Sequence, residues 1–132
     1  MIAETEAVVR LLVALVLGGL IGVERELGHK PAGLRTHMLV SMGACLFTLL
    51  SLQFELDPAR VAAGVVVGIG FIGAGTIIST RGHIQGITTA ACLWVSAALG
   101  LACGLGNFLL ATLVAVVAFL ILQIKRIEEK LL

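Results

Sequence analysis

Charged residues are scarce in this sequence, and tyrosine is absent. Only 13% of the 132 residues are charged, whereas 59% are hydrophobic. Soluble domains average about 25% charged residues, and the mean hydropathy of this chain is +1.12. The composition therefore excludes an ordinary soluble domain and indicates a membrane protein that lies in a lipid bilayer.

Residues that build nucleic-acid, metal or catalytic sites are also few. The net charge is +1, and there is no basic run with interleaved aromatic residues, so no nucleic-acid partner is expected. Cys45, Cys92 and Cys103 stand singly in apolar runs without metal-ligand spacing, which favours a packing role. Because no nucleophile and base gather in one part of the chain, we expect no enzyme activity. We also expect no cofactor, since the sequence gives no support for bound Mg²⁺.

The amino terminus lacks the features of a cleavable signal peptide. Glu4 and Glu6 stand where a signal peptide would be basic. The first apolar run ends at Glu24-Arg25-Glu26 without a small-residue cleavage site. We therefore expect the first apolar segment to remain in the membrane.

Five apolar segments predict the fold. They cover about residues 7–23, 38–54, 61–79, 88–105 and 107–124. Each has about the length that a helix needs to cross a hydrocarbon core. Because no room is left for a soluble domain, we predict a single domain over residues 1–132. Its fold class is an all-α membrane protein, a compact bundle of five transmembrane helices.

The basic residues of the connecting segments predict the orientation. Seven lie on one side of the predicted membrane, namely Arg25, Lys30, Arg35, Arg81, Lys125, Arg126 and Lys130. The other side has two, Arg10 and Arg60. Because cytoplasmic loops carry an excess of Lys and Arg, we predict an external amino terminus and a cytoplasmic carboxyl terminus.

The third segment is unusual in its glycine content. Residues 61–79 carry no charge and contain five glycines, namely Gly64, Gly68, Gly70, Gly73 and Gly75. At about 100° per residue, Gly64, Gly68 and Gly75 fall on one helix face, and Gly70 falls on another. Because small residues let membrane helices approach closely, we predict that this helix packs on two faces and is central in the bundle.

Part of the same segment matches a dinucleotide-binding fingerprint. Gly68-Ile-Gly70-Phe-Ile-Gly73 has the GxGxxG spacing, but that motif requires a preceding strand and an acidic residue about twenty positions later. No Asp or Glu occurs between Asp57 and Glu128. The pattern therefore favours helix packing over nucleotide binding.

Other segments carry rows of small residues at helical spacing. These rows comprise Ala14, Gly18 and Gly22; Ser41, Ala44, Thr48 and Ser51; and Thr88, Cys92, Ser96, Gly100 and Gly104. Gly18 and Gly22 fit either a face of a homodimer or higher oligomer, or packing within one chain. We expect Trp94 to pack in the core and Thr88 and Thr89 to cap the fourth helix. The fifth segment lacks glycine and is expected at the lipid-facing rim.

Polar residues form two candidate functional groups. On the predicted cytoplasmic side they are Glu24, Arg25, Glu26, Arg35, His37, Arg81 and His83. These residues fit either a basic rim that meets anionic lipid or a polar cluster in which Glu24 pairs with Arg35.

The predicted outer side carries the second group, the acidic residues Glu55 and Asp57. Pro58 follows Asp57, an arrangement typical of a helix N-cap. Arg10 stands within the first apolar segment, so it must reach outward or pair with an acid.

Several motifs occur together in a specific order. They are Gly18-Gly19-Leu20-Ile21-Gly22 with Glu24-Arg25-Glu26, Lys30-Pro31-Ala32-Gly33-Leu34-Arg35-Thr36-His37, Asp57-Pro58-Ala59-Arg60, the run from Gly68 to Gly75, and Gly86-Ile87-Thr88-Thr89-Ala90-Ala91 followed by Trp94. With these motifs, nearly the whole chain resembles the MgtC/SapB family of bacterial membrane proteins.

The resemblance implies a five-helix protein of the bacterial inner membrane, linked to growth in low magnesium and to virulence. The best known family member restrains the F-type ATP synthase, and other members are described as magnesium transporters. Longer members add a cytoplasmic carboxyl-terminal domain, whereas this sequence stops at Leu132.

Two functions follow from these observations. The first is a non-enzymatic protein that binds and regulates other membrane proteins, which suits its small-residue helix faces. The alternative is a transporter or channel for Mg²⁺ or another cation. An ion path usually contains ionisable residues at membrane depth, and the second to fifth apolar segments offer none. We therefore favour the regulatory function and assign no metal ligands.

Overall fold

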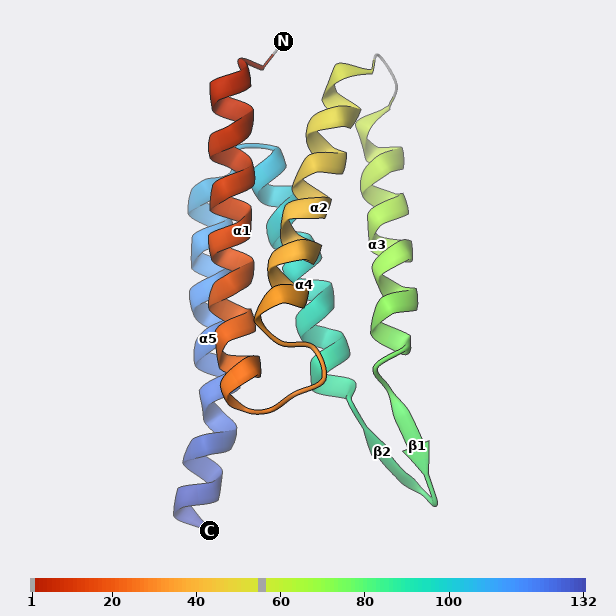
Figure 1. The fold of residues 1–132 in the computed structure, drawn as a ribbon, viewed down its shortest axis with the longest axis vertical. Coiled ribbons are helices and arrows are strands. Elements are labelled where there is room, and N and C mark those ends of the chain that lie inside the picture. The colour runs from red at the N-terminus through yellow and green to blue at the C-terminus, as the bar shows by residue number, and fades with distance from the viewer. Residues whose placement is uncertain (1, 55–56) are drawn as a thin grey trace.

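The computed structural model of the chain describes residues 2–54 and 57–132 (Figure 1). The described residues form five helices, α1 (Glu4–Leu27), α2 (Leu34–Gln53), α3 (Pro58–Ala74), α4 (Ile87–Gly104) and α5 (Phe108–Leu131). Strands β1 (Ile78–Thr80) and β2 (His83–Gln85) form an antiparallel hairpin between α3 and α4.

The helices lie side by side, and the chain reverses direction between them (Figure 1). The loop of residues 28–33, the β-hairpin and the carboxyl terminus lie at one end of the bundle, which we call the hairpin end. The amino terminus and the turn between α4 and α5 lie at the opposite end, which we call the amino-terminal end. The three segments richest in basic residues therefore share one end, as the charge pattern predicted.

The helix lengths fit a membrane-spanning bundle. In the described residues, α1, α2, α4 and α5 are long and apolar enough to cross a bilayer. Helix α3 has 17 residues, which at about 1.5 Å per residue is the short limit for a spanning helix. The predicted all-α membrane fold is confirmed.

Helix α2 lies between the glycine faces of α1 and α4. A Cβ atom at Gly18 of α1 would lie 2.6 Å from the carbonyl oxygen of His37. A Cβ atom at Gly100 of α4 would overlap the carbonyl oxygen of Ser41, and one at Gly104 would lie 2.5 Å from Cβ of Thr48. These glycines let the backbones approach closely. Of the two interpretations of the Gly18–Gly22 face, the structure supports packing within one chain.

The predicted central position of the third helix is wrong. Within α3, all of whose residues are described, only Ile69 and Gly73 are buried. A Cβ atom at Gly64, Gly68 or Gly70 would meet no atom within 4 Å in the described part of the chain. Glycine permits close packing but does not supply a partner, and here α2 pairs with α1 and α4 instead. Helix α3 lies at the edge of the bundle (Figure 1).

The third helix also ends earlier than predicted. It stops at Ala74, and the hydroxyl of Thr76 donates a 2.7 Å hydrogen bond to the carbonyl of Gly73. The hairpin that follows turns at Arg81 and Gly82, whose φ angles are 48° and 83°. Two positive φ values suit a tight hairpin turn. The strands were not predicted because Ile77 and Ile78 continue the apolar run of the helix.

The structure tests three further predictions about α4 and α5, of which two are wrong. The N-cap of α4 is Gly86 with φ 91°, not Thr88 or Thr89. Trp94 of α4 is 54% exposed on the outside of the bundle, so its predicted core position is wrong. Most of α5 is exposed, as predicted for a lipid-facing helix.

Candidate functional site

The predicted polar cluster at the hairpin end divides into a buried part and an exposed part. Glu24 and Arg25 of α1 are each 6% exposed, and His37 of α2 is fully buried. The remaining members, Glu26, Arg35, Arg81 and His83, are exposed. The structure therefore brings three of the seven residues together inside the helix bundle.

Arg25 joins α1 to α4. Its Nη1 lies 3.4 Å from Oε2 of Glu24, and its Nη2 lies 3.5 Å from Oγ1 of Thr89, which is also buried. Both distances exceed the roughly 2.7–2.9 Å of a strong charge-assisted hydrogen bond. Nε of Arg25 has no partner among the described residues. The guanidinium is thus enclosed but only loosely bound.

The predicted pair of Glu24 with Arg35 is wrong. The ion-pair partner of Glu24 is Arg25, its neighbour on α1. Arg35 lies in the first turn of α2 and is exposed. The sequence places both residues at the same end of the bundle, but the rotation of each helix about its axis decides which side chain turns inward.

His37 joins α2 to α4 one step deeper in the bundle. Its Nδ1 lies 2.7 Å from Oγ of Ser96, and both side chains are fully buried. Nε2 of His37 has no partner within the described ranges. The histidine packs close to Gly22 of α1, where an added Cβ atom would be 3.0 Å from Cβ of His37. The sequence pattern placed Ser96 in a row of small packing residues and did not indicate its hydrogen bond with His37.

Ser41 lies one helical turn after His37 on α2. It is fully buried, and its Oγ lacks a hydrogen-bond partner in the part of the chain that the structure describes. Buried polar groups are normally paired with protein or ordered water. Glu24, Arg25, His37, Ser41, Thr89 and Ser96 together form what we call the polar column, at the junction of α1, α2 and α4.

Arg10 occupies the amino-terminal end of the bundle. It forms an ion pair with Glu6 one turn earlier on α1, and its Nη1 donates a 2.6 Å hydrogen bond to the carbonyl of Gly104. The guanidinium therefore satisfies a carbonyl in the last turn of α4, where a cation is favoured. Of the two predicted alternatives, reaching outward or pairing with an acid, the structure shows the ion pair.

Two acids of the predicted groups cap helices. The carboxylate of Asp57 accepts a 2.9 Å hydrogen bond from the backbone N–H of Ala59 at the start of α3. Oε2 of Glu26 accepts a 2.9 Å hydrogen bond from the N–H of Leu34 at the start of α2. The predicted N-cap at Asp57 is confirmed, whereas Glu55 lies outside the described residues.

Nowhere in residues 2–54 and 57–132 do three potential metal ligands gather.

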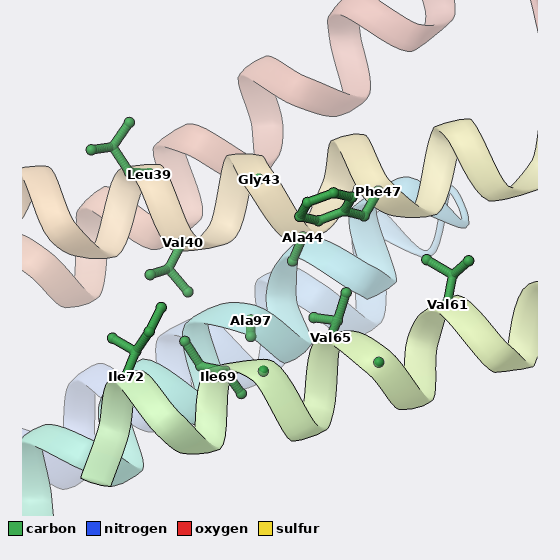
Figure 2. Close-up of a pocket in the computed structure, with 12 residues that line it drawn as sticks. Leu39, Val40, Gly43, Ala44, Phe47, Val61, Val65, Ile69, Ile72 and Ala97 are labelled. Carbon is green, nitrogen blue, oxygen red and sulfur yellow. The ribbon is translucent and has the colours of Figure 1, made fainter. Parts of the chain in front are cut away.

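An apolar groove of about 650 Å³ runs between α2 and α3 (Figure 2). Val40 and Ala44 of α2 face α3, and Ala97 of α4 lies between the two helices. The full lining is Leu39, Val40, Gly43, Ala44, Phe47, Val61, Gly64, Val65, Gly68, Ile69, Ile72 and Ala97. Three of these residues are glycines with no atom of the described chain within 4 Å of an added Cβ. The groove therefore exposes bare helix backbone.

Comparison with known proteins places the chain in a family. The sequence pattern of the MgtC family matches residues 11–131. Protein MgtC of Salmonella typhimurium strain LT2 is 46% identical over 120 residues, which cover 88% of this chain and 52% of that protein. Protein MgtC of Brucella abortus strain 2308 is 50% identical over 95 residues, 70% of this chain and 40% of that protein.

A further relative carries a different name. YhiD of Escherichia coli strain K12, named as a candidate magnesium transporter, is 43% identical over 129 residues, 90% of this chain and 60% of that protein. The chain thus spans between 40% and 60% of the length of these relatives. No solved structure matches it. With its apolar helices and a family pattern that covers most of its length, the chain belongs to the MgtC family of bacterial multi-pass membrane proteins.

Proposed function

We propose that this protein is a non-enzymatic regulator that binds transmembrane helices of other membrane proteins in the groove between α2 and α3. The F-type ATP synthase is the target that the family resemblance suggests. The groove carries the proposal, because Gly43, Gly64 and Gly68 leave its backbone uncovered by the described chain. A partner helix gains most where glycines allow close backbone contact.

The alternative is Mg²⁺ transport, which the name of the relative YhiD favours. The buried polar residues of this chain do not suit such a path. Mg²⁺ is bound by carboxylates and keeps several of its waters, whereas the carboxylate of Glu24 is paired with the Arg25 guanidinium. A cation that entered the polar column from the hairpin end would meet this arginine. The regulatory proposal agrees better with these contacts.

The proposal is tested by filling the groove without disturbing the fold. Gly68→Leu places a side chain in the groove, and Gly70→Leu places the same side chain on α3 outside the groove lining. Neither added Cβ meets an atom of the described chain within 4 Å. Both variants should therefore fold, and only Gly68→Leu should lose regulation.

The measurement is ATP-driven proton pumping in inverted membrane vesicles from a bacterium that lacks its own MgtC-family proteins. Expression of the unaltered chain and of Gly70→Leu should reduce pumping, and Gly68→Leu should not. Equal effects of the two variants would exclude the groove as the binding surface. Saturable Mg²⁺ flux into liposomes that contain only the purified chain would favour transport instead.

A further inference from the structure

A second hollow, of about 320 Å³, lies at the hairpin end, where the loop of residues 28–33 joins α1 to α2. It is lined by Glu26, His29, Lys30, Pro31, Gly33, Arg35 and Thr36. In contrast to the groove between α2 and α3, most of these side chains are polar or charged. The hollow shares no residue with that groove, so what it binds is independent of the proposed function.

The walls of this hollow are held by backbone contacts. The N–H of His29 donates a hydrogen bond to the carbonyl of Glu26, and the N–H of Lys30 donates one to the carbonyl of Arg25. The N···O distance is 3.0 Å in both bonds. His29 has the left-handed φ of 52° that this tight exit from α1 requires. These bonds fix the positions of the Lys30 and His29 backbone relative to the end of α1.

The other wall is fixed by Glu26. Its carboxylate accepts the hydrogen bond from the Leu34 N–H and lies directly against Gly33, where an added Cβ would overlap it. This contact anchors the start of α2 to the end of α1. The hollow is therefore built into the fold and does not depend on a flexible loop.

The charges around the hollow are unequal. Lys30 and Arg35 form no ion pair within the described parts of the chain. By contrast, Lys125 near the end of α5 forms an ion pair with Glu129, at an N···O distance of 3.7 Å. Glu26 is the one carboxylate of the lining, and its Oε2 is engaged with the backbone. The start of α2 adds the partial positive charge of a helix amino terminus. The lining thus carries two cations and one carboxylate, so the hollow presents a net positive charge on a preformed surface.

We propose that this hollow binds a phosphate group, held by the Arg35 guanidinium and the Lys30 ammonium. Arginine and lysine together suit an anion with several oxygens, since one offers a planar fork and the other a compact charge. The phosphate belongs either to the headgroup of an anionic lipid or to a soluble phosphate compound. Leu27, 65% exposed at the last turn of α1, puts an apolar surface just before the hollow.

The test measures binding to the purified full chain in a neutral detergent. Native mass spectrometry would compare dioleoyl phosphatidylglycerol with dioleoylglycerol, which has the same acyl chains without phosphate. Inorganic pyrophosphate would be titrated separately as the soluble probe. Preferential retention of phosphatidylglycerol identifies a lipid headgroup site, and saturable pyrophosphate binding identifies a site for soluble phosphate compounds. Equal retention of the two lipids with no pyrophosphate binding would overturn the proposal.

Matched variants assign the binding to the hollow. Lys30→Gln combined with Arg35→Gln should weaken phosphate binding at least about tenfold, because each charged contact is a strong one. Arg126→Gln combined with Lys130→Gln removes the same charge from the same end of the bundle and should leave the affinity within about twofold. Equal weakening by both pairs would show that only the net charge attracts phosphate, and would refute the site.

A gain-of-affinity variant provides a second measurement. Glu26→Gln keeps an oxygen for the Leu34 N–H but removes the negative charge beside the hollow, so phosphate binding should tighten several-fold. The unfolding temperature would be recorded for each variant. If the double variant of Lys30 and Arg35 is unstable, Arg35→Gln alone replaces it in the binding measurement. Failure of Glu26→Gln to tighten binding in a chain that melts normally would contradict the proposed location.

Discussion

His37 of α2 and Ser96 of α4 form a hydrogen bond of 2.7 Å between two fully buried side chains. Gly22 of α1 lies against the same histidine, because a Cβ atom there would come within 3.0 Å of His37 Cβ. Three helices therefore meet at one polar contact. The small residue on α1 makes room for the histidine, and the hydroxyl on α4 satisfies one of its nitrogens.

Loss of the Ser96 hydroxyl is expected to destabilise this junction. Ser96→Ala leaves both ring nitrogens of His37 without a partner in the described structure, so the free energy of unfolding should fall by about 1–2 kcal/mol. Ser79→Ala, at an exposed position of β1, is the control and should be neutral. Reversible unfolding in mixed detergent micelles measures both variants, and equal stabilities would show that the bond contributes nothing.

Arg25 should contribute more to stability than the exposed basic residues at the same end. Arg25→Ala leaves the buried Glu24 carboxylate without its cation, a change that can cost about 3–5 kcal/mol. Arg126→Ala removes an exposed arginine of α5 and should change stability by less than about 0.5 kcal/mol. The yield of folded, monodisperse protein in detergent and its unfolding midpoint give the comparison. If the two variants are alike, Arg25 acts only as an orientation signal.

Glycines of α4 and α3 should differ sharply in their tolerance of leucine. Gly100→Leu drives a side chain into the backbone of α2 at Ser41 and should prevent folding. Gly70→Leu meets open space and should leave the folded yield unchanged. If α3 were central in the bundle, leucine at Gly70 would be expected to disrupt it. The position of α3 at the edge predicts the opposite result. Size-exclusion chromatography of the two purified variants in detergent decides between these outcomes.

The orientation in the membrane remains a prediction from the charge bias. A reporter fused after Leu132 should be active only in the cytoplasm, and one inserted between Gly106 and Asn107, in the turn joining α4 to α5, only outside. Figure 1 shows the two positions at opposite ends of the bundle, joined by α5, so we expect them on opposite sides of the membrane. Reporters that read the same side would refute the membrane crossing of α5, and a reversed pattern would refute the charge assignment.

Local features of the candidate site follow directly from the sequence. Asp57 before Pro58 predicts a helix cap because its side-chain oxygen reaches the next N–H groups along the chain. Arg10 forms an ion pair with Glu6 because residues four apart share a helix face. The predicted row on α4 shares one helix face for the same reason, and all of it except the exposed Thr88 is buried. Each of these inferences depends only on the spacing of residues along a single segment of the chain.

Contacts between helices are different, because small residues permit close approach without choosing a partner. The glycines of α1 and α4 pack against α2, whereas Gly64, Gly68 and Gly70 of α3 meet nothing in the described chain. No periodicity distinguishes the two cases, since both have glycines at helical spacing.

By itself, therefore, the sequence determined the membrane class, the number of helices in the described residues, the Asp57 cap of α3 and the end where the basic residues gather, since these depend on composition and short-range spacing. The tertiary structure alone decided that Arg25 rather than Arg35 is the ion-pair partner of Glu24. It also decided that His37 meets Ser96 and that α3 leaves an open groove. The physical reason is that these contacts depend on the rotation and relative depth of whole helices, which the total packing energy of the bundle sets.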